Sequence, residues 1–138
     1  MGNHRAGAMS GIRILVVDDD SSVRELVSHV LLAKGFEVFS SADAEGALAI
    51  LDRERVDLVI TDKRLPDMDG HALIETIFRV HPYVGTMMFT AYRSAQSLDM
   101  ARQQKVLAYL EKPLRDLTVI PRLVESALEQ HRKRLGRP

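Results

Sequence analysis

The sequence predicts an α/β protein made of a single doubly wound domain, in which a five-stranded parallel sheet alternates with helices. Short apolar runs alternate along the chain with segments of helical periodicity, a pattern typical of repeated βα units. The predicted strands lie near residues 12–18, 37–40, 58–61, 86–89 and 107–110. Three of these runs are apolar throughout, as expected for strands that helices cover on both faces.

Length and composition agree with one globular unit. A chain of 138 residues that is 46% hydrophobic fits one domain with an ordinary core. The 19 basic residues balance 19 acidic ones, so no overall field favours nucleic acid or an anionic membrane. Cysteine is absent, and no apolar run approaches the roughly 20 residues that span a bilayer. We expect a soluble cytoplasmic protein that binds neither nucleic acid nor membrane directly.

The two ends of the chain differ from its middle. Residues 1–11 are small and polar without an apolar signal-peptide core, so we expect a disordered tail there. Residues 12–131 form the expected domain. Residues 132–138 form a basic C-terminal tail in this interpretation.

The first two helices have clear sequence signals. Apolar residues at helical spacing define the first one: Val23, Leu26, Val27, Val30 and Leu31. Ser22 and Glu25 fit a capping box at its start, and Gly35 supplies its end. The second helix, over residues 44–51, tolerates Gly46 at a cost of about 1 kcal/mol relative to alanine.

The later helices are less regular. The third begins near His71, and a fourth, over residues 94–105, has only a narrow apolar stripe, so it should be the least firmly held. The last helix runs to about Arg134. Proline cannot lie deep in a helix without breaking a hydrogen bond. Either Thr118 caps a late start and Pro121 lies in the first turn, or the helix kinks at Pro121.

Polar residues follow the predicted strands at the point where each strand ends. Asp18 and Asp19 follow the first strand, Asp62 the third, Thr90 the fourth and Lys112 the fifth. In an open parallel sheet, ligands bind beyond the carboxyl ends of the strands, so these residues should share one site. Clustered carboxylates repel each other unless a cation such as Mg²⁺ lies between them. We expect the aspartates to form the centre of the site.

This set of groups suits phosphoryl transfer. A metal ion and a lysine can neutralise phosphoryl oxygens, a threonine can donate a hydrogen bond, and a carboxylate can attack phosphorus. Each residue alone has a simpler explanation: residues 18–20 could only cap the first helix, and Thr90 and Lys112 could be ordinary strand-end residues. Because these explanations must hold independently at separate strand ends, we favour a common site.

Several short stretches around these residues are found together in one protein family. They are Val17-Asp18-Asp19, the run from Asp57 to Asp62 leading into Leu65-Pro66-Asp67-Met68-Asp69-Gly70, then Thr90-Ala91, Tyr109 and Lys112-Pro113. Together they make residues 11–130 resemble the CheY-like receiver domain of two-component response regulators. Each stretch is a weak signal by itself, whereas the combination is very specific.

The resemblance implies a flavodoxin-like strand order of 2-1-3-4-5 and a regulatory phosphoacceptor instead of an enzyme. Asp62 would receive its phosphoryl group from the phosphohistidine of a sensor histidine kinase or phosphotransfer protein. The domain would promote its own phosphorylation and dephosphorylation. Asp19 would hold Mg²⁺ directly and Asp18 largely through water, with the Asp62 carboxylate and the backbone carbonyl of Arg64 completing the protein ligands.

The resemblance also implies how a signal leaves the site. Thr90 and Lys112 would bind the phosphoryl oxygens, and the bond between Lys112 and Pro113 would be a cis peptide. Tyr109 would turn inward when Thr90 moves. The surface of the fourth helix, fifth strand and fifth helix would then change its affinity for a partner or for a second copy of the chain in a homodimer.

Two other classes of function use similar residues. An Mg²⁺-dependent phosphohydrolase with an aspartyl nucleophile usually has an acidic residue two positions after that nucleophile, where this chain has Arg64. A degenerate receiver that only binds partners would not need an intact set of acidic, hydroxyl and lysine groups. Arg64 and Tyr92 flank the expected path of a hydrolytic water. Whether they shield an acyl phosphate or point to solvent stays open.

Overall fold

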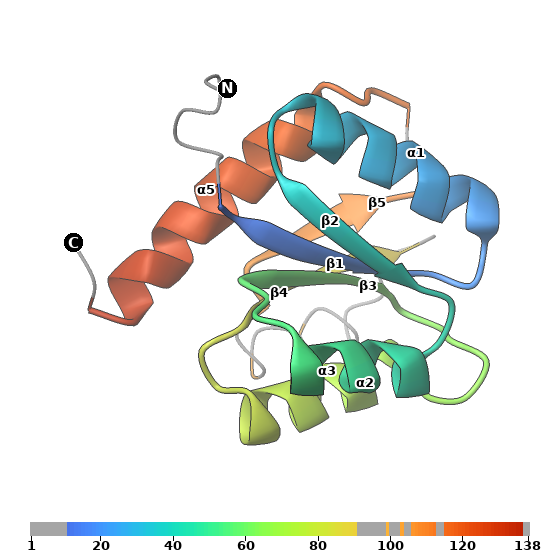
Figure 1. Ribbon diagram of the computed structural model, residues 1–138, viewed down its shortest axis with the longest axis vertical. Coiled ribbons are helices and arrows are strands. Elements are labelled where there is room, and N and C mark those ends of the chain that lie inside the picture. Colours follow the sequence, from blue (N-terminus) through green and yellow to red (C-terminus); the bar gives the residue numbers. More distant parts are fainter. Residues whose placement is uncertain (1–10, 91–98, 100–102, 104–105, 113–114, 137–138) are drawn as a thin grey trace.

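Figure 1 shows the computed structural model, in which a parallel sheet lies between two layers of helices. The structure describes residues 11–90, 99, 103, 106–112 and 115–136. The elements follow in the order β1 (Arg13–Val17), α1 (Ser21–Ala33), β2 (Glu37–Ser41), α2 (Ala44–Arg53), β3 (Leu58–Asp62), α3 (Gly70–Val80), β4 (Gly85–Thr90), β5 (Ala108–Glu111) and α5 (Val119–Arg134). All neighbouring strands are parallel, in the order β2-β1-β3-β4-β5, which confirms the predicted fold.

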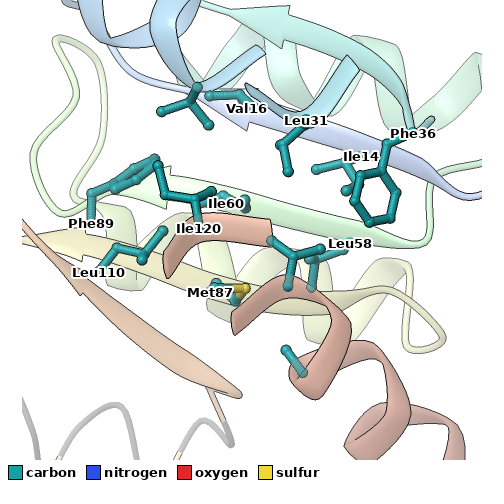
Figure 2. Packing of buried hydrophobic residues seen from close by; sticks show 13 residues of the cluster. Ile14, Val16, Leu31, Phe36, Leu58, Ile60, Met87, Phe89, Leu110 and Ile120 are labelled. Atoms are coloured by element: carbon teal, nitrogen blue, oxygen red, sulfur yellow. The ribbon is translucent and has the colours of Figure 1, made fainter. Parts of the chain in front are cut away.

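Alternate residues of each strand enter different cores because successive side chains point to opposite faces of a sheet. Ile14 and Val16 of β1 join a cluster with Leu31 of α1 and Ile120 of α5. Figure 2 shows Leu31 and Ile120 pointing into this cluster from the two helices. Leu15 and Val17 belong to a second cluster, on the face that α2 and α3 cover. This double coverage explains why most residues of β1 and β3 are apolar.

The start of α1 differs from the prediction. Asp20 is the N-cap and its carboxylate accepts a hydrogen bond of 2.9 Å from the amide of Ser22. The predicted capping box of Ser22 and Glu25 is therefore wrong, because Asp20 already occupies the capping position before the helix. Gly35 ends the helix as predicted: its φ is +95°, and the amide of Phe36 donates back to the carbonyl of Leu31.

The start of α5 agrees with the predicted late start, but the predicted cap by Thr118 is wrong. The helix begins at Val119, so Pro121 lies in its first turn, where no helical hydrogen bond is lost. Thr118 occupies the N-cap position without capping the helix, since its hydroxyl donates to Asp116 Oδ1 at 2.6 Å. Residues 132–134 of the basic segment form the last turn of α5.

The fourth helix predicted over residues 94–105 lies outside the described residues, apart from Asp99 and Gln103, which are helical. In the part of the chain that the structure describes, no helix combines the length and apolarity needed to cross a membrane.

Neighbouring leucines of α1 test the assignment of its buried face. Leu31 is fully buried and Leu32 is 55% exposed. We expect Leu31→Ala to lower the free energy of unfolding by about 2–5 kcal/mol, because it removes core contacts and leaves a cavity. Leu32→Ala, the matched control, should change it by no more than about 0.5 kcal/mol. Urea denaturation measures both, and equal losses would contradict the assignment.

Candidate functional site

The site forms where the chain crosses from one half of the sheet to the other. After β1 the chain runs outward to β2 and returns to β3, on the other side of β1. Such a change in strand order opens a crevice beyond the carboxyl ends of the two strands. Val17 of β1 lies opposite Thr61 of β3, so the next residues of both strands, Asp18 and Asp62, emerge at the same level.

Three carboxylates meet in this crevice. Asp18, Asp19 and Asp62 offer oxygen atoms that all lie within 4.8 Å of one another. Their exposure differs: Asp18 is fully buried, Asp62 is half-buried and Asp19 is exposed. The structure therefore brings together the aspartates that follow the first and third strands, in an arrangement open to solvent on the side of Asp19.

Lys112 brings a positive charge to these carboxylates from the far side of the sheet. It directly follows β5, and its Nζ lies 2.7 Å from Asp18 Oδ2 and 3.4 Å from Asp62 Oδ2. The ammonium also lies 5.9 Å from the centre of the Phe89 ring in β4. Lys112 thus links the ends of three strands, β1, β3 and β5, through charge.

Asp18 is held by further hydrogen bonds. Its Oδ1 accepts one of 2.9 Å from the amide of Asp20. Its backbone carbonyl accepts one of 2.7 Å from the guanidinium of Arg24, a contact that no sequence pattern predicts. The simpler explanation of residues 18–20 as helix caps holds for Asp20 alone. The buried Asp18 and the exposed Asp19 are left to face the crevice.

The loop between β3 and α3 directly follows Asp62 and is held by its own hydrogen bonds. The amide of Lys63 donates to Asp62 Oδ1 at 2.8 Å, and the amide of Gly70 donates to the carbonyl of Lys63 at 2.6 Å. Arg64 and Asp69 form an antiparallel bridge across the base of the loop. A Cβ atom at Gly70 would collide with the carbonyl oxygen of Asp62. Only glycine lets α3 begin this close to the end of β3.

The surroundings of the site raise the pKa values of both Asp62 and Lys112. Burial raises the pKa of the Asp62 carboxyl above its usual 3.8, and the charge of Asp18 raises it further, although Lys112 partly opposes both. Burial would lower the pKa of Lys112, but its hydrogen bond to Asp18 and the two carboxylate charges raise it above 10.5. At neutral pH the lysine is protonated, and its ammonium lies close to two of the three carboxylates, those of Asp18 and Asp62. The cluster favours a further cation.

Two further predicted site residues, Thr90 and Tyr109, belong to the neighbouring strands β4 and β5. Thr90 ends β4, where it is paired in register with Glu111. Tyr109 is half-buried in β5, opposite Met88. The side chain of Thr90, as well as Tyr92 and Pro113 with the predicted cis peptide bond, falls outside the described part of the chain.

The chain is similar to proteins of one family. The sequence pattern of the response regulator receiver domain matches residues 14–124. The response regulator protein FleR of Pseudomonas aeruginosa is 36% identical over 118 residues, which make up 86% of this chain and 25% of FleR. Sporulation initiation phosphotransferase F of Bacillus subtilis is 30% identical over 105 residues, covering 76% of this chain and 85% of that protein. The chain thus spans only a quarter of the length of FleR.

Solved structures agree with this similarity. A CheY-like response regulator receiver domain protein from Methanospirillum hungatei has a TM-score of 0.82 and 29% identity, covering 89% of this chain and 98% of that one. The chemotaxis response regulator CheY4 of Vibrio cholerae has a TM-score of 0.78 and 26% identity, covering 84% of this chain and 98% of that one.

The raised pKa of Asp62 predicts that this carboxylate destabilises the metal-free fold at neutral pH. Between pH 3.8 and the folded-state pKa, the folded protein binds more protons at Asp62 than the unfolded chain does. The stability from Asp62 is therefore present below that window and lost as the pH rises through it. We expect Asp62→Asn to raise the free energy of unfolding at pH 7 in EDTA, with a gain that shrinks toward pH 4.

Urea denaturation at several pH values measures this effect. Glu25→Gln, on the exposed side of α1, is the control and should show no such gain. A loss of stability in Asp62→Asn at pH 7, or a gain independent of pH, would show that Asp62 is not held as a destabilised anion.

Proposed function

The chain belongs to the response regulator receiver domain family, and on this basis we propose that Asp62 is its phosphoacceptor. Receiver domains are signalling domains that histidine kinases or phosphotransfer proteins phosphorylate in two-component systems. The observation that carries the proposal is the position of Asp62. It ends β3 at the change in strand order, 3.4 Å from the Lys112 ammonium and beside two further carboxylates.

The proposed reaction is a single displacement at phosphorus. A carboxylate oxygen of Asp62 attacks the phosphoryl group of a phosphohistidine, and the new O–P bond forms as the P–N bond breaks. The electron pair of the broken bond stays on the imidazole nitrogen. The ionised carboxylate is the nucleophile, and a raised pKa makes that carboxylate more basic and a better nucleophile.

We propose that Lys112 balances negative charge before phosphoryl transfer and binds phosphoryl oxygens after it. In the free protein its ammonium balances the negative charges of Asp18 and Asp62. A phosphoryl group on Asp62 would bring oxygens within reach of the same ammonium, so the lysine can bind them without moving far. Thr90, at the end of the neighbouring β4, is proposed to donate a hydrogen bond to another of these oxygens.

We propose Mg²⁺ as the cation of the acidic site, with Asp19, Asp62 and the backbone carbonyl of Arg64 as direct ligands. Oxygen ligands within 4.8 Å of one another fit this ion. Both carboxylate oxygens of Asp18 already accept hydrogen bonds, from Lys112 and from the amide of Asp20, which supports a role through water. When bound, Mg²⁺ neutralises charge on the transferring phosphoryl group.

We propose that phosphorylation changes the surface at the edge of the sheet that contains β5. Movement of Thr90 toward a phosphoryl group would vacate space that Tyr109 can fill, exchanging one packed arrangement for another. The surface around β5 and α5, with the fourth helix, would then bind a partner or a second copy of the chain differently. We also propose that the domain promotes its own dephosphorylation and works in the cytoplasm.

Phosphorylation of Asp62 can be tested directly. Incubation with acetyl phosphate and Mg²⁺ should add one phosphoryl group to the protein, which intact mass spectrometry detects. Asp62→Asn should accept none, because an amide is a poor nucleophile. Lys112→Ala should react about 100-fold more slowly, because a positive charge is lost from the developing phosphoryl oxygens.

Asp57 supplies the matched control, because it directly precedes β3 and so lies at the opposite end of that strand from Asp62. Asp57→Asn should keep the reaction. EDTA should abolish labelling of the native protein. Labelling that persists in Asp62→Asn or in EDTA would refute the phosphoacceptor or the metal role, respectively.

A further inference from the structure

The loop between β3 and α3 is tied to a helix that follows a different strand. Asp67 extends from this loop to the start of α2, where its Oδ1 accepts a hydrogen bond of 3.0 Å from the amide of Ala44. Its Oδ2 accepts one of 2.9 Å from the amide of Glu45. Both amides belong to the first turn of α2 and have no partner within the helix. One carboxylate thus joins two segments far apart in sequence.

The helix does not depend on Asp67 alone for its N-terminal cap. Asp43, the residue before α2, accepts a hydrogen bond of 2.7 Å from the amide of Gly46. Asp43 and Asp67 therefore satisfy different amides of the same helix end. The two hydrogen bonds from Ala44 and Glu45 hold the pKa of Asp67 below its usual value, so the link persists throughout the neutral range.

The loop is short and closed, which connects Asp67 to the site. At its base, Arg64 and Asp69 form a backbone β-bridge, and the carbonyl of Lys63 accepts a hydrogen bond from the amide of Gly70. Within the loop, the amide of Leu65 donates to the carbonyl of Met68 at 3.2 Å. Asp67 lies inside this turn. A tether at Asp67 therefore restricts the whole loop, including the peptide of Arg64, two residues after Asp62.

We propose that Asp67 is a positioning residue for the metal site: by anchoring the loop to α2, it holds the backbone carbonyl of Arg64 where Mg²⁺ binds. This inference rests on the proposed function, in which that carbonyl is a metal ligand. Side chains of Leu65 and Met68 also pack against the core beneath α2 and α3, so the loop stays folded without Asp67. Loss of the tether should therefore loosen the metal ligand without unfolding the domain.

Metal binding is the direct readout. Isothermal titration with Mg²⁺ should show that Asp67→Ala binds the ion about tenfold more weakly than the native protein, an effect typical of groups that orient metal ligands. Asp67→Asn retains one acceptor oxygen and should fall between the two. When acetyl phosphate is the phosphodonor, the Mg²⁺ concentration that gives the half-maximal rate should also rise about tenfold in Asp67→Ala. The rate at saturating Mg²⁺ should stay unchanged.

Two control variants separate positioning from simpler effects. Asp43→Ala removes a cap from the same helix without touching the loop, and Glu45→Gln removes an exposed negative charge beside Asp67 while keeping its hydrogen bonds. Both should bind Mg²⁺ like the native protein.

Native Mg²⁺ affinity in Asp67→Ala would overturn the positioning role and leave the proposed function intact. An equal loss of affinity in Asp43→Ala or Glu45→Gln would overturn it too, because helix stability or charge would then explain the effect. Failure of the native protein to bind Mg²⁺ would refute both proposals.

Discussion

The charge balance among Asp18, Asp62 and Lys112 is the constraint on which the site depends. Asp18 is fully buried, and an unpaired buried carboxylate is strongly destabilising. Its partner, Lys112, lies 94 residues away in the sequence. These three groups meet only when β1, β3 and β5 are assembled in one sheet, so the site depends on the completed sheet.

The ion pairs of Lys112 do not neutralise all the negative charge of the site. The ammonium of Lys112 pairs with Asp18 and Asp62, and Asp19 adds a third carboxylate, so these four groups together carry an excess of negative charge when all are ionised. The apolar packing of the two cores must compensate for that excess. The same excess gives the protein its affinity for a cation and a basic carboxylate, an example of stability exchanged for function.

The sequence predicted the features that depend on periodicity and on the ends of strands. Apolar runs such as residues 14–17 identify buried strands, and parallel strands place their carboxyl ends at one edge, so the meeting of Asp18, Asp62 and Lys112 could be expected. The sequence alone does not decide the start of α5, because Pro121 fits either a first turn or a kink. The observed start of the helix at Val119 places Pro121 in the first turn.

Contacts between distant segments were harder to predict. The tether from Asp67 to α2 and the bond from Arg24 to the Asp18 carbonyl depend on how a loop and a helix lie relative to neighbouring elements. No local pattern records that relation. The capping of α1 was mistaken for a related reason: Asp20 and Ser22 both fit a cap, and the path of the chain after β1 favours Asp20.

The most direct test of this account is the titration of the Asp62 carboxyl carbon, followed by NMR in the absence and presence of Mg²⁺. Without metal, the pKa of Asp62 should lie above 3.8, because burial and the charge of Asp18 outweigh Lys112. It should rise further in Lys112→Met and fall when Mg²⁺ is added to the native protein. An Asp62 pKa at or below 3.8 that does not respond to Mg²⁺ would contradict the account.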